Sequence, residues 1–356
     1  MSVDIWNSSY VPTVFLRPSE LRAVSELPDS SKDVLTPIFC LKPWATSKLL
    51  ENSMNKISSV FPNRDFFLDI DPFYDREATR PAQEEYYELI DHKDNNKSWV
   101  DFFQKYPHAY PCIQVNHGEI EPIEFQIQSF KQSEKFFLVR LDHDCGRNHS
   151  EIINRVCAVD HSNFGFVVDA GWSKRLLDRA LWADGLIKQI AKLRGDSIPI
   201  VVTGSSFPNS FTGFAMGESA DLLERKIFAQ LQGANNMARL VYGDWSSSRS
   251  PSEGGGGGSI PPRIDLPTSS SWEIYRADDK VETFQGLAAE VMKSSSFPKN
   301  LDIWATYMIA KTKIGEPRGI DNLRMATAVR INMHLYNQLN FGRFDPAPDT
   351  DDDYIE

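Results

Sequence analysis

Carboxylate and guanidinium side chains recur at the ends of short apolar segments in this sequence. The segment FFLVRLD ends in Arg140 and Asp142, and the segment FFLDID ends in Asp69 and Asp71. Clustered carboxylates raise one another's pKa or bind a divalent metal through their oxygens, and arginine forks suit a phosphate or carboxylate group. Such residues could perform acid–base chemistry or hold an anionic ligand, provided that the fold brings them together.

Side-chain parity predicts that these groups face one common side. Alternate residues of a strand share a face, so Arg140 and Asp142 lie on one face of their segment while Val139 and Leu141 lie on the other. Several other segments also become polar on one face only as they end. The residues selected in this way are Asp69, Asp71, Arg140, Asp142, Asp169, Thr203, Ser205, Asp244 and Arg276.

A structural role is the alternative for each of these residues. Aspartate is a common turn residue and helix N-cap, so a single Asp is more often structural than functional. For Arg140 with Asp142 or Asp169, an ion pair that only stabilises the fold is as well supported as a site. Ser205 lies in no nucleophile elbow and fits a capping turn better, and His334 in RINMHLYNQL fits a core or surface histidine. The joint recurrence of the pattern is what favours a site.

Short apolar segments alternate with longer amphipathic stretches along the chain. The strand candidates span residues 10–16, 36–41, 66–71, 110–115, 136–141, 164–169, 198–204, 238–244 and 272–278. Runs this short and apolar suit strands that are covered on both faces, as the strands of parallel sheets are. Residues 173–194 and 218–234 have the clearest helical spacing between them.

This alternation predicts an α/β fold, namely a (β/α)8, TIM-barrel-like closed parallel barrel with extra C-terminal helices. An open doubly wound sheet is the alternative. Because there are nine strand candidates and a barrel needs about eight, one of them must lie outside the barrel or be misassigned. Active sites of such barrels lie at the C-terminal ends of the strands, so the polar residues above are expected to meet in the barrel mouth.

A single domain is expected over residues 1–345. Residues 246–271 are rich in Ser, Gly and Pro, which predicts a mobile surface loop. The run Gly254–Gly258 inside it matches no phosphate-binding fingerprint. Residues 346–356 are acidic and predict a disordered tail.

Composition narrows the classes of partner and the compartment. The net charge of −11 disfavours direct nucleic-acid binding, which normally needs a basic face. The cysteines Cys40, Cys112, Cys145 and Cys157 show no CxxC spacing and are expected to be reduced thiols. No apolar run is long enough to cross a bilayer, and the N-terminus lacks the pattern of a signal peptide. We therefore expect a cytoplasmic protein without a membrane partner.

A set of motifs, spread in order over nearly the whole chain, shares its pattern with a known family. The motifs are YVPTVFLRPSELRAVSEL, LTPIFCL, VVTGSSFP, LVYGDW, WEIYRAD and VRINMHLYNQL. Together they resemble the phage T4-type Beta protein family, the beta family protein of phages and bacteria. The resemblance implies an accessory protein of phage–host conflict or mobile-element loci, sometimes beside nuclease-like partners, with no established reaction. It also implies important positions at Asp69, Arg140, Asp169, Asp244, Arg276 and His334.

Two kinds of function fit these observations. The first is an accessory protein of a phage–host conflict or mobile-element module, which uses the barrel as a scaffold to bind a protein partner, such as a nuclease or toxin, or an anionic small molecule. The second is a metal-assisted hydrolase or lyase that acts on a phosphate-bearing small molecule or nucleotide at the C-terminal mouth of the barrel. A divalent metal is the cofactor considered, and its ligands stay open.

The second function assigns roles to the polar residues. The predicted catalytic residues are Asp69, Arg140, Asp142, Asp244 and Arg276, and the predicted ligand-binding residues are Asp71, Asp169, Thr203, Ser205 and His334. An open pocket lined by these residues would support binding or catalysis. Residues that pair off in a closed core would support the scaffold instead, which the sequence favours because it contains no recognised catalytic motif.

Overall fold

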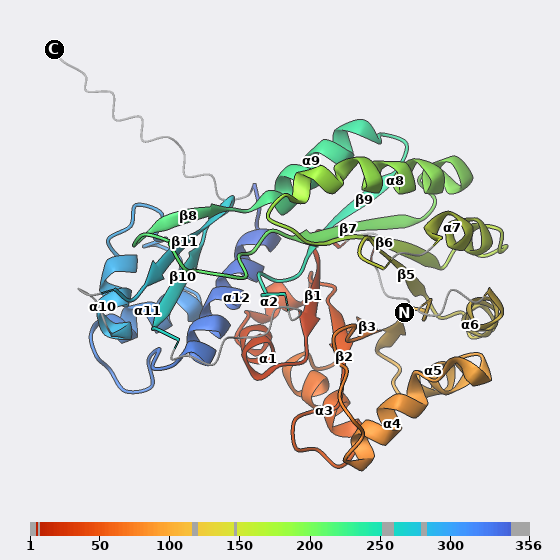
Figure 1. Ribbon diagram of the computed structural model, residues 1–356, viewed down its shortest axis with the longest axis horizontal. Coiled ribbons are helices and arrows are strands. Elements are labelled where there is room, and N and C mark those ends of the chain that lie inside the picture. The colour runs from red at the N-terminus through yellow and green to blue at the C-terminus, as the bar shows by residue number, and fades with distance from the viewer. Residues whose placement is uncertain are drawn as a thin grey trace.

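The main body of the molecule is a parallel sheet curled into a barrel with helices around it (Figure 1). The structure is a computed structural model that describes residues 5, 8–115, 120–145, 148–250, 260–278 and 283–342. The barrel strands are β1 (Val11–Phe15), β2 (Ile38–Leu41), β3 (Phe66–Ile70), β4 (Ala109–Pro111), β5 (Phe137–Asp142), β6 (Phe164–Trp172), β7 (Pro199–Ser205) and β9 (Arg239–Asp244). Their order in the sheet is β4-β3-β2-β1-β9-β7-β6-β5.

The barrel closes between β4 and β5, the two strands at the ends of this order. A parallel bridge joins Cys112 to Leu138, and the Ile113 amide donates a hydrogen bond over 2.9 Å to the Leu138 carbonyl oxygen. Closure leaves no long unpaired edge and makes the strand ends converge on one mouth. The predicted TIM-barrel-like fold is confirmed, and the open doubly wound sheet is not what forms.

Helices follow the strands and cover the outside of the barrel. They are α1 (Pro18–Ser25), α2 (Asp29–Lys32), α3 (Glu51–Val60), α4 (Pro81–Leu89), α5 (Lys97–Phe102), α6 (Ile120–Gln132), α7 (His149–Cys157), α8 (Ala180–Arg194) and α9 (Leu223–Ala234), with 3-10 turns η1 (His92–Asp94) and η2 (Leu176–Arg179). The predicted helix over 173–194 is thus confirmed in its main part. Its first turn is 3-10, which shifts the phase of the helix and leaves Leu181 82% exposed.

The last barrel helix comes from the far end of the chain. Helix α12 (Leu323–Leu339) packs against α1, and Arg225 of α9 donates a hydrogen bond over 2.7 Å to the Gln338 side chain of α12. Its buried Ile331 and Leu335 belong to the same core as the outward side chains of the barrel strands. Helix α12 therefore fills the position between α9 and α1 that completes the ring.

A smaller antiparallel sheet stands beside the barrel, with the predicted extra helices on one face (Figure 1). It contains β8 (Glu218–Asp221), β10 (Arg263–Pro267) and β11 (Ser271–Arg276), in the order β10-β11-β8. Helices α10 (Phe284–Val291) and α11 (Trp304–Lys313) pack with α12 over it. Apart from β8, which lies between β7 and α9, this unit is inserted between β9 and α12.

The inserted sheet differs from the sequence-based expectation in two places. Residues 218–221 form strand β8, where a helix over 218–234 was expected to begin. The strand was missed because these residues are mostly exposed and lack the apolar pattern that predicts a strand. Residues 263–267 form strand β10 inside the range 246–271, where only a loop was expected. The ninth strand candidate is β11, and it lies outside the barrel, as the count of candidates required.

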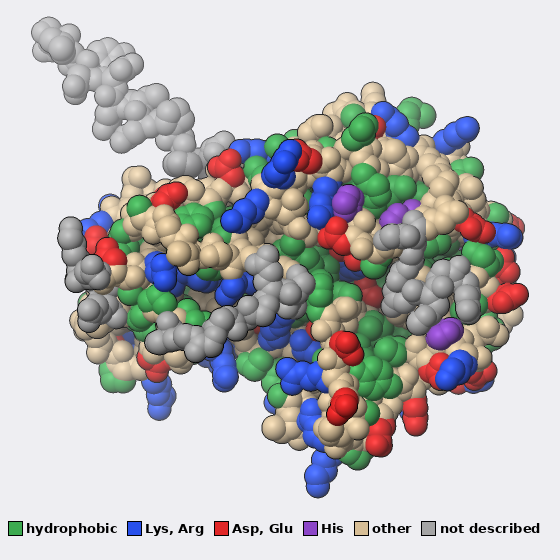
Figure 2. Space-filling model, viewed as in Figure 1, with side chains coloured by type: hydrophobic (Ala, Val, Ile, Leu, Met, Phe, Trp, Pro, Cys, Tyr) green, Lys and Arg blue, Asp and Glu red, His purple; other side chains and the backbone are tan. Residues whose placement is uncertain are grey.

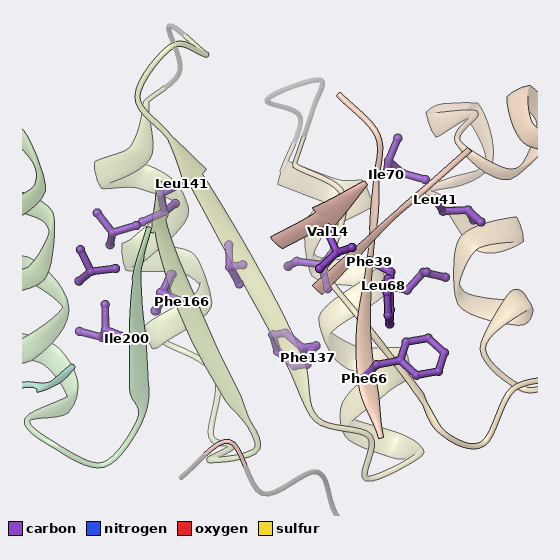
Figure 3. Close-up of a cluster of buried hydrophobic side chains, with 14 of the residues drawn as sticks. Val14, Phe39, Leu41, Phe66, Leu68, Ile70, Phe137, Leu141, Phe166 and Ile200 are labelled. Carbon is purple, nitrogen blue, oxygen red and sulfur yellow. The ribbon is translucent and has the colours of Figure 1, made fainter. Parts of the chain in front are cut away.

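Two apolar layers hold the barrel together. The layer inside it consists of Ile5, Val11, Ile38, Phe67, Tyr110, Cys112, Phe136, Leu138, Val167, Val201 and Val241. The layer between strands and helices uses residues of the opposite parity, such as Phe39, Leu68, Phe137 and Phe166 (Figure 3). Burying each such side chain contributes about 1.5–3 kcal/mol, so parity fixes which residues reach the interior.

Three further expectations concern the thiols, the membrane and the tail. Cys40, Cys112, Cys145 and Cys157 are all free, as expected for reduced thiols. Within the described ranges, we find no helix with the length and apolar character to cross a bilayer. The acidic tail over 346–356 lies outside the described residues.

Candidate functional site at the barrel mouth

Arg140 is the centre of a charged cluster inside the barrel, above the apolar layer. Its Nε lies 2.7 Å from Oδ2 of Asp69, and its Nη1 lies 2.7 Å from Oδ2 of Asp169. Its Nη2 donates a hydrogen bond over 3.3 Å to the Thr13 hydroxyl. Strand parity places all four residues on the inner face, so this part of the predicted convergence is confirmed.

The surroundings of Arg140 hold it as a fixed cation. The Arg140 side chain is 11% exposed. Burial opposes its charge, but Asp69 and Asp169 raise the pKa of the guanidinium above its ordinary value. The Trp245 ring lies 5.1 Å from the guanidinium carbon, and the Trp245 indole donates a hydrogen bond over 3.1 Å to Oδ1 of Asp169. Because the Gly171 amide donates to the same oxygen over 2.9 Å, both oxygens of Asp169 are occupied.

Aromatic side chains cover the cluster on the side of the mouth. Phe15 stacks on Trp245 with ring centroids 5.1 Å apart, and Trp172 lies 4.2 Å from Trp245. Phe73 packs edge-on against Trp172 at 5.4 Å. Trp172 is tied down by a hydrogen bond over 3.1 Å to the Ser248 carbonyl oxygen. The aromatic group restricts access of water and ligands to the ion pairs below it.

Asp142 lies at the mouth next to this cluster. It is the strand partner of Asp169, and its carboxylate accepts a hydrogen bond over 2.8 Å from the Asp144 amide. Burial, and after it the Asp169 carboxylate, raise the pKa of Asp142 above its ordinary value. Among the predicted catalytic carboxylates, Asp142 is therefore the one that takes up a proton more readily than an ordinary aspartate.

The remaining predicted residues of this rim have local partners of their own. Asp71 forms an ion pair of 2.7 Å with Lys42. The Ser205 hydroxyl accepts a hydrogen bond over 3.3 Å from the Phe207 amide, which fits the turn role. The Thr203 hydroxyl is buried and has no hydrogen-bond partner among the described residues.

Two cysteines also line the charged cluster. Burial raises the pKa of Cys112 and Cys40 well above the ordinary value, and the carboxylates of Asp69 and Asp71 act in the same direction. Both thiols are therefore neutral, and neither is an activated nucleophile.

Asp244 does not join the mouth cluster, so the expectation that it faces the barrel interior was wrong. It lies on the outer face of β9 under α12, where it accepts hydrogen bonds from Tyr10 (2.6 Å) and Tyr242 (3.0 Å) and pairs with His334 at 2.9 Å. Burial alone would raise the pKa of Asp244, but His334 and the hydrogen bonds hold it below its ordinary value.

The close packing around Gly243 determines which side chains of β9 face the barrel interior. A Cβ atom at this position would lie 2.7 Å from the Val11 carbonyl oxygen and 2.9 Å from the Val201 side chain, so Gly243 faces the crowded interior. Asp244 must then face outward, and Trp245 faces inward again. The interior role of Trp245 was missed because strand parity had been assigned with Asp244 on the inner face.

Arg276 lies in the inserted sheet and contributes nothing to the barrel mouth. Its Nη1 is 3.5 Å from the Phe211 carbonyl oxygen. The predicted site residues therefore divide into three groups: the mouth around Arg140, the Asp244–His334 pair under α12, and Arg276 in β11. Thr13, which the sequence analysis missed, was marked by being the one polar residue of the strand VPTVF.

The mouth does not fit a divalent metal. Across the described ranges, no set of three or more His, Cys, Asp or Glu side chains is placed to hold a metal ion. Asp69 and Asp169 each direct an oxygen at Arg140, and Asp244 points away from both. The chemistry that the mouth can supply is a fixed guanidinium between two carboxylates, with Asp142 beside it.

Comparison with known proteins agrees with the resemblance of the motifs. The family model described as Beta protein matches residues 10–340. The chain is 25% identical over 351 residues to Protein beta of Enterobacteria phage P4, an alignment that covers 95% of each chain. The chain belongs to the Beta protein family.

Proposed function

We propose that this phage-related protein is an accessory protein of a phage–host conflict or mobile-element module, and that it acts by binding a protein partner. The family relation to Protein beta of phage P4 supports a phage-associated role. A nuclease-like or toxin protein is the partner class to test first. Catalysis at the barrel mouth is not needed for this function.

The observation that carries the proposal is that the guanidinium of Arg140 already has hydrogen-bond partners within the protein. An anion-binding arginine needs donors that are free for the ligand, whereas the donors of Arg140 go to Asp69, Asp169 and Thr13. One guanidinium between two carboxylates also leaves an excess of negative charge, which disfavours an anionic substrate. Such a buried cluster of ion pairs is typical of groups that fix the fold.

Exposed apolar side chains mark surfaces where a partner could bind. Tyr307 and Ile314 lie on and after α11, whereas Leu177 and Leu181 lie on η2 and at the start of α8. The two groups define two separate faces. Replacing Leu181 or Ile314 with Asp tests each face without touching the barrel interior.

Co-expression with the products of the genes adjacent to its own tests the proposal. We expect one product to form a complex that is stable in size-exclusion chromatography with light scattering. The Asp142→Asn variant should form it equally well, and one of Leu181→Asp and Ile314→Asp should prevent it. Absence of any complex would contradict the proposal, and so would a complex that depends on Asp142.

The raised pKa of Asp142 favours a second candidate, a hydrolase or lyase acting on a phosphate-bearing small molecule or nucleotide. A carboxyl group that holds its proton longer can act as a general acid. Thermal-shift measurements with nucleotides, with and without Mg²⁺ or Mn²⁺, test this candidate. A shift in Tm that Asp142→Asn abolishes would support it, whereas equal Tm values in both proteins with every ligand would oppose it.

A further inference from the structure

A second group of arginines lies on the inner face of the inserted sheet, away from the barrel mouth. Arg263 of β10 and Arg276 of β11 are direct partners in the antiparallel ladder, so their side chains share one face. Arg330 of α12 approaches the same face. Figure 2 shows Lys and Arg side chains gathered between the inserted sheet and the barrel, on a molecule whose net charge is −11.

A single carboxylate serves two of these guanidiniums. Arg330 Nη1 lies 2.7 Å from Oδ2 of Asp265, and Arg263 Nε lies 2.8 Å from its Oδ1. Within the described part of the chain, Arg276 forms no ion pair. Glu20 also favours the charged form of Arg330, but less than Asp265 does, and Glu20 forms its own ion pair with Arg17 at 3.5 Å.

Two phenylalanines hold the guanidiniums close to one another. The Arg263 guanidinium lies 3.3 Å from the centroid of Phe211, and Arg276 contacts the Phe211 carbonyl oxygen. The Arg330 guanidinium lies 4.3 Å from the centroid of Phe207, which packs 5.6 Å from Phe211. The ring faces favour the cations but do not neutralise them.

The charge of this cluster is incompletely compensated. Counting the described residues in direct contact within this cluster, three guanidiniums and one carboxylate leave an excess of two positive charges. The Arg330 side chain is only 3% exposed, and its buried Nε has no hydrogen-bond partner among the described residues. Burial lowers the pKa of Arg330, as does Arg263, although Asp265 acts in the opposite direction. Buried positive charge in excess of the neighbouring carboxylates is costly unless an anion joins it.

We propose that Arg263, Arg276 and Arg330 form a binding site for the phosphate group of a small molecule. A phosphate monoester carries about −1.5 to −2 charges at neutral pH, which matches the excess of the cluster. Guanidinium forks also match the geometry of phosphate oxygens. Arg263 and Arg330 are largely buried and Arg276 is partly exposed, so the cluster suits a small anion better than the surface of another protein.

This site goes beyond the proposed partner-binding function, and its test is independent of it. The purified chain is titrated with inorganic phosphate, pyrophosphate and AMP at an ionic strength held constant with KCl, and binding is followed by Tm and by calorimetry. We expect all three to bind and to raise Tm. Tighter binding of AMP than of inorganic phosphate would identify an organic phosphate ester as the ligand, and equal binding would identify the free phosphate group.

Arg276→Gln is the decisive variant, because Arg276 is partly exposed and can be changed without leaving a buried partner unpaired. We expect it to weaken phosphate binding by at least about tenfold, as loss of a charged hydrogen bond does. Arg175→Gln is the matched control, since Arg175 is 83% exposed and lies outside the inserted sheet, between β6 and η2. The proposal is overturned if none of the three probes raises Tm above the KCl reference, or if Arg276→Gln binds them as tightly as the control.

Discussion

The barrel mouth and the arginine cluster of the inserted sheet use the same groups in opposite proportions. At the mouth, one guanidinium lies between the carboxylates of Asp69 and Asp169. In the inserted sheet, Asp265 pairs with Arg263 and Arg330, and Arg276 lies opposite Arg263. At the mouth, every nitrogen of the one guanidinium is bonded to Asp69, Asp169 or Thr13, whereas in the inserted sheet the described guanidiniums outnumber the carboxylate that they contact. Buried arginine therefore indicates an anion-binding site only where guanidiniums exceed the carboxylates beside them.

The largest effect that tests this comparison is expected from Arg140→Met. Removing the guanidinium leaves Asp69 and Asp169 as uncompensated buried carboxylates, which should lower the free energy of unfolding by about 3–5 kcal/mol. Urea unfolding followed by circular dichroism measures it. The triple variant with Asp69→Asn and Asp169→Asn should recover much of the loss. A loss below about 1 kcal/mol in the single variant would show that the mouth does not stabilise the barrel.

Asp244→Asn should have the next largest effect, although Asp244 was predicted as catalytic. An amide in place of the carboxylate turns an NH₂ group towards the donors of Tyr10, Tyr242 or His334, which should cost about 2–3 kcal/mol at pH 7. The folded-state pKa of Asp244 is lowered from 3.8. The advantage of the wild type is therefore present above about pH 4 and is lost as the pH falls through the lower folded value. An equal difference between the two proteins at pH 7 and pH 2 would contradict this account.

Sequence patterns predicted the barrel well because parity and strand length are local properties. In the apolar segments that contain Asp69, Arg140 and Asp169, the alternation of side chains predicted which face each residue occupies. Strands β3, β5 and β6 then bring these residues together. Asp244 was placed on the wrong face because the preceding residues of its strand, Tyr242 and Gly243, fit either orientation until the crowding at Gly243 is known.

Other features of the two regions depend on contacts that no local pattern contains. Tyr10 and Asp244 are 234 positions apart, and Arg330 and Asp265 are 65 positions apart. Strand β10 lies within a stretch that looks like a loop, so neither its pairing with β11 nor the meeting of Arg263 with Arg276 could be predicted. Of the strands of the inserted sheet, only β11 was therefore predicted from the sequence.

Asp142→Asn should stabilise the protein slightly at neutral pH. The folded-state pKa of Asp142 is raised from 3.8 by burial and by Asp169, so its charged form is disfavoured in the folded protein. That disadvantage is absent below the unfolded pKa and develops as the pH rises through the folded value. We therefore expect Asp142→Asn to raise Tm at pH 7 and to leave it unchanged at pH 3. A lower Tm at pH 7 would mean that the negative charge of Asp142 stabilises the fold, as the charges of Asp69 and Asp169 do.

The smallest effect on stability is expected from Arg276→Gln in the absence of phosphate. Like charges directly opposite each other in an antiparallel pair repel, and Arg276 faces Arg263, so the substitution should be neutral or should stabilise by at most about 1 kcal/mol. Any gain should shrink as KCl is raised, because salt screens the repulsion between partly exposed groups. With phosphate present the order should reverse, since the wild type gains a ligand that the variant binds poorly. A clear loss of stability in phosphate-free buffer would mean that Arg276 is held by the fold as Arg140 is, and the contrast between the two regions would disappear.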